Sequence, residues 1–325
     1  MSELLRVENL KVHFPVSAAA NNKLFSFEKK VLKAVDGVSF TMDKGEVVAL
    51  VGESGCGKST VGKALVSLVS KTDGNVCYQG ENVSDKKSMA KLRKNIQYIF
   101  QDPYSSLNPR MTVKTILSRP MEVFDLHKDP EDREKRLSEL MKQVGLLKEH
   151  GLRFPHEFSG GQKQRISIAR ALAVEPELII ADEPTAALDV SIQAQVLKLL
   201  VNLKETLGLT MLFISHDLGV VEYISDRILV MYLGTIVESG PTKDVINRPL
   251  HPYTKALLTA VPKNPLQVQD EVFKLQGNIP SAMNVPSGCR LHPRCPYATQ
   301  ACKSWEAQLV EVEPGRKVSC IRYCK

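Results

Sequence analysis

Residues 52–60 have the composition and spacing of a loop that binds phosphate. They read Gly-Glu-Ser-Gly-Cys-Gly-Lys-Ser-Thr after an apolar run, and so match the pattern G-x-x-x-x-G-K-[ST] at every position. The glycines allow the backbone to wrap closely around an anion, with successive N–H groups directed at it. Lys58 would place a positive charge at the β- and γ-phosphates, and Ser59 would offer a hydroxyl to Mg²⁺. The predicted nucleotide-binding residues of this loop are Gly52, Ser54, Gly55, Cys56, Gly57, Lys58, Ser59 and Thr60. A glycine-rich turn without a ligand is the alternative.

Two adjacent carboxylates form the second chemical signal. Asp182 and Glu183 directly follow the apolar run 178–181, which is typical of a buried strand. At the end of such a strand, Asp182 could hold Mg²⁺, an ion that usually takes one or two carboxylates and keeps several waters. Glu183 could then orient the attacking water and accept its proton, as phosphoryl transfer requires. A solvated turn is the alternative interpretation of this pair.

A third signal lies between these two, in residues 158–165, which read Phe-Ser-Gly-Gly-Gln-Lys-Gln-Arg and precede a helical pattern. Ser159 and the glycine amides at a helix N-terminus would form an anion clamp. Here the chain resembles the ATP-binding subunits of ABC transporters, whose signature Leu-Ser-Gly-Gly-Gln is matched with Phe158 in the first position. In that family the signature closes on ATP held by the opposite subunit, which implies this role for Ser159, Gly160, Gly161 and Gln162.

The resemblance assigns further residues in the order in which the family carries them. Gln101 resembles the glutamine that contacts Mg²⁺ and the attacking water, so that Ser59, Gln101 and Asp182 are the implied Mg²⁺ ligands. His216 resembles the switch histidine at the γ-phosphate, and residues 186–189 resemble the loop at the subunit interface. The implied catalytic residues are Glu183, His216 and Gln101. Phe27, or alternatively Phe25, is the candidate for stacking on adenine.

Strand-like runs alternate with helical patterns through the first 240 residues, which indicates an α/β core with a largely parallel sheet. Together with the resemblance, this predicts a P-loop NTPase of ABC type with a helical subdomain at about residues 105–175. We expect a nucleotide-binding domain over 1–250 and a C-terminal extension over 251–325 that carries a cysteine-rich tail.

Composition is ordinary for a globular chain of 325 residues, with 43% hydrophobic and 24% charged residues. The net charge of +7 is spread over the sequence and does not require nucleic acid as a partner. No apolar segment approaches the length of about 18 residues needed to span a bilayer, and the N-terminus lacks the layout of a secretory signal. We therefore expect a protein that reaches the cytoplasmic face of the plasma membrane only through a partner.

A closer resemblance covers essentially the whole chain. Residues 4–14, 34–40 and 100–110 and the motif His-Pro-Tyr-Thr at 251–254 resemble the oligopeptide and dipeptide importers among ABC transporters. This implies ATP hydrolysis that powers peptide import. The implied partners are a second ATP-binding subunit, two transmembrane permease subunits and, indirectly, an extracytoplasmic peptide-binding protein. A soluble ABC-type ATPase of nucleic-acid repair or translation is the alternative function, and the cargo remains open between dipeptides, longer peptides and another solute such as nickel.

Five of the seven cysteines lie between residues 289 and 324. In a chain without a secretion signal, such a cluster favours a metal site over disulfides. Cys289, Cys295, Cys302 and Cys320 are spaced more widely than usual zinc ligands, which suits an iron–sulfur cluster somewhat better than zinc. The related importers carry a similar tail, for which a [4Fe–4S] cluster is the implied occupant. We therefore predict a [4Fe–4S] cluster on these four residues, with zinc, unligated thiols or disulfides as alternatives.

Overall fold

A computed structural model describes residues 2–16, 30–259 and 273–324 of the chain. The chain divides into two compact units, each assembled from separate segments of the sequence. The first unit comprises Met1–Leu4, Met42–Val47 and Tyr78–Ile214, and the second comprises Leu5–Thr41, Val48–Cys77 and Ser215–Lys325. Within the described ranges, no helix is long and apolar enough to cross a membrane.

The first unit contains a parallel sheet of buried strands. β7 (Leu178–Asp182) lies between β6 (Ile96–Ile99) and β8 (Thr210–Ser215), and it pairs in parallel with both. All five residues of β7 and all six of β8 are buried, as expected for strands covered on both faces. The register places Asp182 opposite Ile214 at the carboxyl end of this sheet, the end at which α/β proteins commonly bind ligands.

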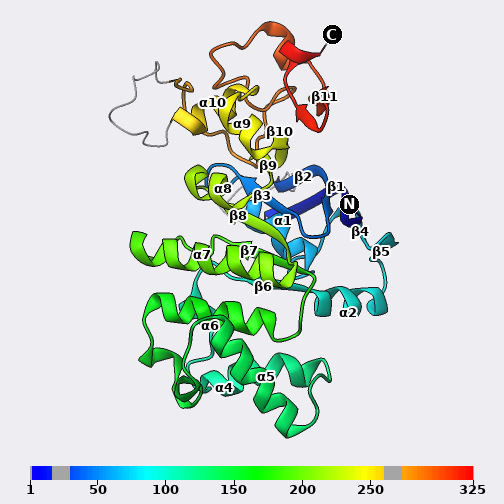
Figure 1. Ribbon diagram of the computed structural model, residues 1–325. Helices are drawn as coiled ribbons and strands as arrows, with labels where there is room; N and C mark the ends of the chain where they lie inside the picture. The colour runs from blue at the N-terminus through cyan, green and yellow to red at the C-terminus, as the bar shows by residue number, and fades with distance from the viewer. Residues whose placement is uncertain (1, 17–29, 260–272, 325) are drawn as a thin grey trace, which may run out of the picture. The chain divides into compact units, whose positions relative to one another are not determined.

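Helices make up most of the remainder of the first unit (Figure 1). They are α2 (Lys86–Asn95), α3 (Pro103–Ser106), α4 (Val113–Val123), α5 (Pro130–Gln143), α6 (Gly160–Leu172) and α7 (Val190–Leu207), with 3₁₀ turns at Lys148–Leu152 and Pro155–Glu157. Several begin at a residue whose side chain accepts a backbone N–H, which satisfies amides that the helix leaves unpaired. Thr112 does so for α4 and Asp129 for α5. Short polar residues in the sequence therefore fix where these helices start.

The second unit is built on a mixed sheet. β3 (Val47–Val51) pairs in parallel with β9 (Arg227–Tyr232), which continues in antiparallel fashion into β10 (Thr235–Pro241). A C-terminal hairpin of β11 (Val310–Glu313) and β12 (Arg316–Val318) extends this sheet, because β12 pairs with β10. A second sheet places β1 (Glu3–Val16) between β2 (Lys30–Asp43) and β4 (Asp73–Tyr78).

The helices of the second unit are short. They are α1 (Lys58–Leu65), α8 (Leu218–Ile224), α9 (Thr242–Asn247) and α10 (Pro252–Thr259). In Figure 1, α9 lies beside β10, near the C-terminal hairpin. The hairpin therefore pairs with β10, and its Glu313 contacts Arg248, the residue that follows α9.

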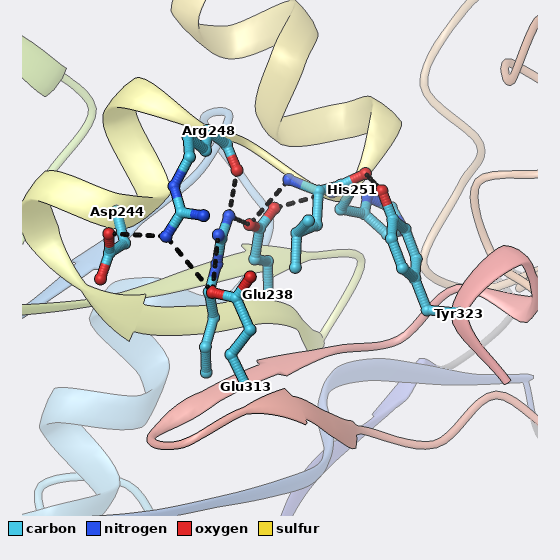
Figure 2. Close-up of polar contacts among 8 residues, drawn as sticks. Glu238, Asp244, Arg248, His251, Glu313 and Tyr323 are labelled. Atoms are coloured by element: carbon cyan, nitrogen blue, oxygen red, sulfur yellow. Dashed lines mark hydrogen bonds and ion pairs between the residues drawn. The ribbon is translucent and has the colours of Figure 1, made fainter.

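A buried ion pair joins the hairpin to β10 (Figure 2). Arg316 and Glu238 have side chains only 1% and 0% exposed, and their charged atoms lie 3.3 Å apart. Glu238 also accepts the backbone N–H groups of Leu250 at 2.9 Å and His251 at 2.8 Å, while Arg316 donates to the carbonyl oxygen of Arg248. This network fixes the chain at the point where α10 begins.

Candidate functional site

The phosphate loop follows β3, every residue of which is buried. Gly52 and Gly57 have φ angles of +154° and +107°, which favour glycine. A Cβ atom at Gly52 would collide with the carbonyl oxygen of Met231, and one at Gly57 would collide with that of Ala34. The glycines of the motif are therefore required by the neighbouring backbone as well as by the turn itself.

Lys58 folds back over this loop. Its side chain is buried, and Nζ donates to the carbonyl oxygens of Gly52 at 2.8 Å and Glu53 at 3.1 Å. Helix α1 begins at Lys58, and no side chain caps its first amides. Ser54 and Gly55, earlier in the loop, are exposed. Amides at the start of a helix that no side chain caps suit an anion, so this loop fits a phosphate group.

The sulfur of the loop has a packing role. Cys56 is buried, and burial raises the pKa of its thiol despite the nearby Lys58 ammonium. A thiol held neutral in this way is not a reactive nucleophile.

The two predicted carboxylates lie at the carboxyl end of β7. Asp182 is buried and accepts a hydrogen bond of 2.6 Å from the hydroxyl of Tyr98 on the adjacent strand β6. Burial and the charge of Asp182 raise the pKa of Tyr98, so this hydroxyl stays protonated and donates. Tyr98 was not among the predicted site residues, and only its place in the strand-like run that leads to Gln101 could have drawn attention to it.

Glu183 adopts an unusual backbone conformation for its residue type. Its φ of +45° lies in the left-handed region, and its N–H donates to the carbonyl oxygen of Ile214 at 2.9 Å. Such conformations cost about 1–3 kcal/mol and cluster at functional sites. The Gln101 side-chain amide donates to the Glu183 carboxylate at 3.0 Å. The first unit therefore brings together Gln101 and Glu183, two of the three predicted catalytic residues.

The third predicted catalytic residue, His216, belongs to the second unit. It is exposed and lies between the end of β8 and the cap of α8. Asp217 provides that cap by accepting the N–H groups of Gly219 at 2.9 Å and Val220 at 3.3 Å. Phe27, the predicted adenine-stacking residue, and its alternative Phe25 lie outside the described residues.

The signature segment forms the start of α6. Ser159 accepts the N–H of Gln162 at 3.3 Å, and the Gln162 side chain accepts the N–H of Ser159 at 3.0 Å, which is a capping box. A Cβ atom at Gly161 would collide with the side chain of Ile192. Ser159 is exposed at this helix start, a position suited to an anion that arrives from outside the unit.

The cysteine tail contradicts the predicted metal cluster. In residues 2–16, 30–259 and 273–324, no group of three or more His, Cys, Asp or Glu side chains is arranged to hold a metal ion. The iron–sulfur prediction and its zinc alternative are therefore wrong for the described chain. All seven cysteines are free thiols, so no disulfide replaces the predicted cluster.

The physical reason lies in the packing of these thiols. Cys289, Cys295, Cys302 and Cys320 line one small cavity of about 20 Å³, which has room for about one water molecule and not for a cluster. Burial raises the pKa of Cys289 to about 11 and also raises the pKa values of Cys295 and Cys320. Neutral thiols of this kind pack as small apolar groups.

Comparison with known proteins agrees with the nucleotide-binding geometry. Residues 35–186 match the family described as ABC transporter, and residues 237–302 match the oligopeptide/dipeptide transporter C-terminal region. The oligopeptide transport ATP-binding protein AppF of Bacillus subtilis is 47% identical over 98% of this chain and 97% of its own length. The dipeptide transport ATP-binding protein DppF of Haemophilus influenzae is 46% identical over 98% of this chain and 96% of its own.

Solved structures share the fold. CbiO1 from Clostridium perfringens, part of an ABC transporter complex, aligns with a TM-score of 0.64 and 27% identity over 76% of this chain and 92% of its own. A dimeric ATP-binding cassette in a post-hydrolysis state with ADP and Pi gives a TM-score of 0.64 and 28% identity over 74% of this chain and 99% of its own. The P-loop α/β fold of ABC ATPases is thus confirmed. The chain is an ATPase that belongs to the oligopeptide and dipeptide transport ATP-binding proteins of the ABC transporter family.

Proposed function

We propose that this chain hydrolyses ATP to power the import of di- or oligopeptides through a membrane permease. The observation that carries the choice of cargo is the match of residues 237–302 to the C-terminal region of oligopeptide/dipeptide transporters. It is supported by relatives that are named as peptide transport ATP-binding proteins and align along nearly the whole chain.

The proposed chemistry begins with the carboxylate of Glu183. It orients the attacking water and accepts its proton, while the Gln101 amide, which donates to this carboxylate at 3.0 Å, holds it in place. His216 contacts the γ-phosphate in this proposal, and Lys58 neutralises phosphate charge. Ser59, Gln101 and Asp182 are the residues that would hold Mg²⁺, which supplies further charge neutralisation when bound. The donor set of hydroxyl, amide oxygen and carboxylate fits the preference of this ion for oxygen.

The signature residues Ser159, Gly160, Gly161 and Gln162 act in trans in this proposal. The exposed start of α6 presents Ser159 and the glycine amides that follow it to ATP held by a second ATP-binding subunit. Two permease subunits then anchor the pair at the cytoplasmic face of the plasma membrane, and an extracytoplasmic peptide-binding protein delivers the cargo. Within the chain, residues 1–250 would bind nucleotide, helices of about 105–175 would form a subdomain, and residues 251–325 would form the importer extension.

Reconstitution tests this proposal. The chain is assembled with its permease subunits and second ATPase subunit in proteoliposomes, and ATP hydrolysis and uptake of labelled di- and oligopeptides are measured with the peptide-binding protein present. Peptide-loaded binding protein should stimulate hydrolysis and drive uptake, and Glu183→Gln should remove both. Stimulation by a nickel-loaded binding protein with no response to any peptide would overturn the proposed cargo.

A further inference from the structure

Two residues of the C-terminal part of the chain, Tyr253 and Arg294, form hydrogen bonds with Glu53 of the phosphate loop. The guanidinium of Arg294 makes a two-point contact with the Glu53 carboxylate, with N–O distances of 2.9 and 3.2 Å. The backbone N–H of Glu53 donates to the hydroxyl of Tyr253 at 2.7 Å. Glu53 is one of the variable positions of the loop motif, so the motif itself does not explain these contacts.

Both contacts are sheltered from water. The Arg294 side chain is 9% exposed and that of Glu53 is 28% exposed, while Tyr253 is fully buried. Paired arginine–carboxylate hydrogen bonds are roughly twice as strong as neutral ones and fix the orientation of both groups. Burial alone would lower the pKa of Arg294, but hydrogen bonding and the charge of Glu53 outweigh burial and raise it. Burial raises the pKa of Tyr253, so its hydroxyl remains neutral.

The two residues are themselves held by packed structure. Tyr253 lies in the first turn of α10. The segment before this helix is held in place because the Glu238 carboxylate accepts the backbone N–H groups of Leu250 and His251 (Figure 2). The ring of Tyr253 packs against the ring of Tyr232, with 4.6 Å between the ring centroids. Arg294 sits in a turn in which its N–H donates to Leu291 at 2.8 Å. Neither contact is therefore made by a freely moving surface side chain.

Glu53 also contacts Lys58, the positively charged residue of the phosphate loop. Lys58 Nζ donates to the carbonyl oxygen of Glu53 at 3.1 Å, next to its bond with Gly52. The backbone of Glu53 is therefore held at its N–H by Tyr253 and at its carbonyl oxygen by Lys58. Its side chain is held by Arg294. Rotation of this peptide would move both the loop amides and the lysine that a phosphate group requires.

We propose that Arg294 and Tyr253 are positioning residues that hold the phosphate loop in its nucleotide-binding conformation, so that the C-terminal region sets the affinity for ATP. This inference rests on the ATPase activity of the chain and goes beyond its proposed role in peptide import. Neither residue touches the reacting atoms, and each acts through Glu53.

The test measures ATP affinity and turnover in the full-length protein. Arg294→Ala should raise both the Kd for Mg-ATP and the KM by about tenfold, the change expected when a charged hydrogen-bonded pair is lost. The kcat at saturating ATP should stay within about twofold of wild type, because the catalytic carboxylate is untouched. Arg294→Lys should recover only part of the affinity, since an ammonium cannot make the two-point contact.

A variant that leaves Arg294 in place keeps the test falsifiable if Arg294→Ala folds poorly. Tyr253→Phe removes one hydroxyl, keeps the buried ring and should weaken ATP binding by a smaller factor than Arg294→Ala. Glu53→Gln combined with Arg294→Ala should be no weaker in ATP binding than Arg294→Ala alone, because both changes break one pair. Arg248→Ala is the matched control: this exposed arginine pairs with Asp244 and Glu313 and does not contact the loop, so ATP affinity should not change.

Three results would overturn the inference. They are a lowered melting temperature in Arg294→Ala with unchanged Kd and KM, a loss confined to kcat, or an equal effect of Arg248→Ala. The Kd is measured on the full-length chain, and KM and kcat on its assembly with the second ATP-binding subunit; none of these measurements needs transported cargo. Failure of peptide uptake would therefore count against the proposed function while leaving the shift in ATP affinity as a separate result.

Discussion

The phosphate loop and the cysteine tail both stand out by the spacing of special residues, yet only the loop has the geometry that its spacing predicts. Residues 52–57 are consecutive, and all three glycines among them have the positive φ angles that such a turn requires. The four tail cysteines span residues 289–320, and their side chains are placed by packing around a small cavity. A contiguous motif constrains its own backbone, whereas widely spaced ligands depend on a fold that the spacing does not specify.

The largest expected effect tests the catalytic side of this comparison. Glu183→Gln should keep ATP binding but lower kcat by about 10²–10⁴, because the amide retains the shape and loses the proton acceptor. Steady-state ATPase assays with a parallel measurement of nucleotide affinity check this. Near wild-type turnover would remove Glu183 from its role as proton acceptor.

The next largest effect is expected on the stability of the C-terminal part, which holds a buried ion pair between Arg316 and Glu238. Arg316→Ala leaves the Glu238 carboxylate buried beside a lost partner and should lower the free energy of unfolding by about 3–5 kcal/mol. Urea denaturation measures the loss. Arg248→Ala removes exposed ion pairs from the same network and should cost at most about 1 kcal/mol. Equal losses in the two variants would contradict the importance of the buried pair.

A smaller loss of stability is expected when Tyr98, the hydrogen-bond donor to Asp182, is changed. Tyr98→Phe removes the hydroxyl that donates to Asp182 at 2.6 Å and should cost about 1.5–3 kcal/mol, the range for hydrogen bonds to charged groups. Thermal and urea denaturation would measure it, with the ATPase rate recorded on the same samples. An unchanged midpoint would show that this bond contributes nothing to stability.

His251 should make the stability of the C-terminal part depend on pH. Burial lowers the pKa of His251 to about 3, opposed by a hydrogen bond with the Ser319 backbone, and Nδ1 accepts the N–H of Tyr253 at 3.2 Å. The unfolded chain takes up a proton at the usual pKa of about 6.5, whereas the folded chain does not until about pH 3. Stability from the neutral ring is therefore full above about pH 6.5 and falls by up to about 2 kcal/mol at pH 5.

A pH series of urea denaturation curves checks this dependence. The wild type is compared with His251→Gln, which keeps a polar side chain without a group that titrates in this range. The variant should lose less stability between pH 7 and pH 5 than the wild type. Parallel curves for the two proteins would show that another group causes the dependence.

The smallest expected effect is in the cysteine tail itself. Cys295→Ser replaces a partly buried thiol that holds no metal in the described chain, so we expect a loss below about 1 kcal/mol and an unchanged ATPase rate. Limited proteolysis of the tail and the melting temperature measure the change. Loss of the folded tail in this variant would show that Cys295 has a structural role beyond packing as a small apolar group.

Contacts between residues far apart in the chain could not be predicted from the sequence. Tyr98 and Asp182 are 84 residues apart, and Arg294 and Glu53 are 241 residues apart. Lone tyrosine and arginine residues carry no local pattern that pairs them with a particular carboxylate. The wrong cluster prediction has the same origin, because thiol spacing does not reveal burial or the size of the cavity between side chains.

The sequence by itself determined the elements whose chemistry is local. The phosphate loop after a buried strand, the Asp182-Glu183 pair at a strand end and the helix that starts at Ser159 all follow from contiguous residues and backbone preferences. Only the tertiary structure decided that Gln101 meets Glu183, that Arg294 and Tyr253 hold Glu53, and that the cysteines pack as thiols. Those outcomes depend on how separate segments bury their apolar surface together, which fixes the partners of each polar group.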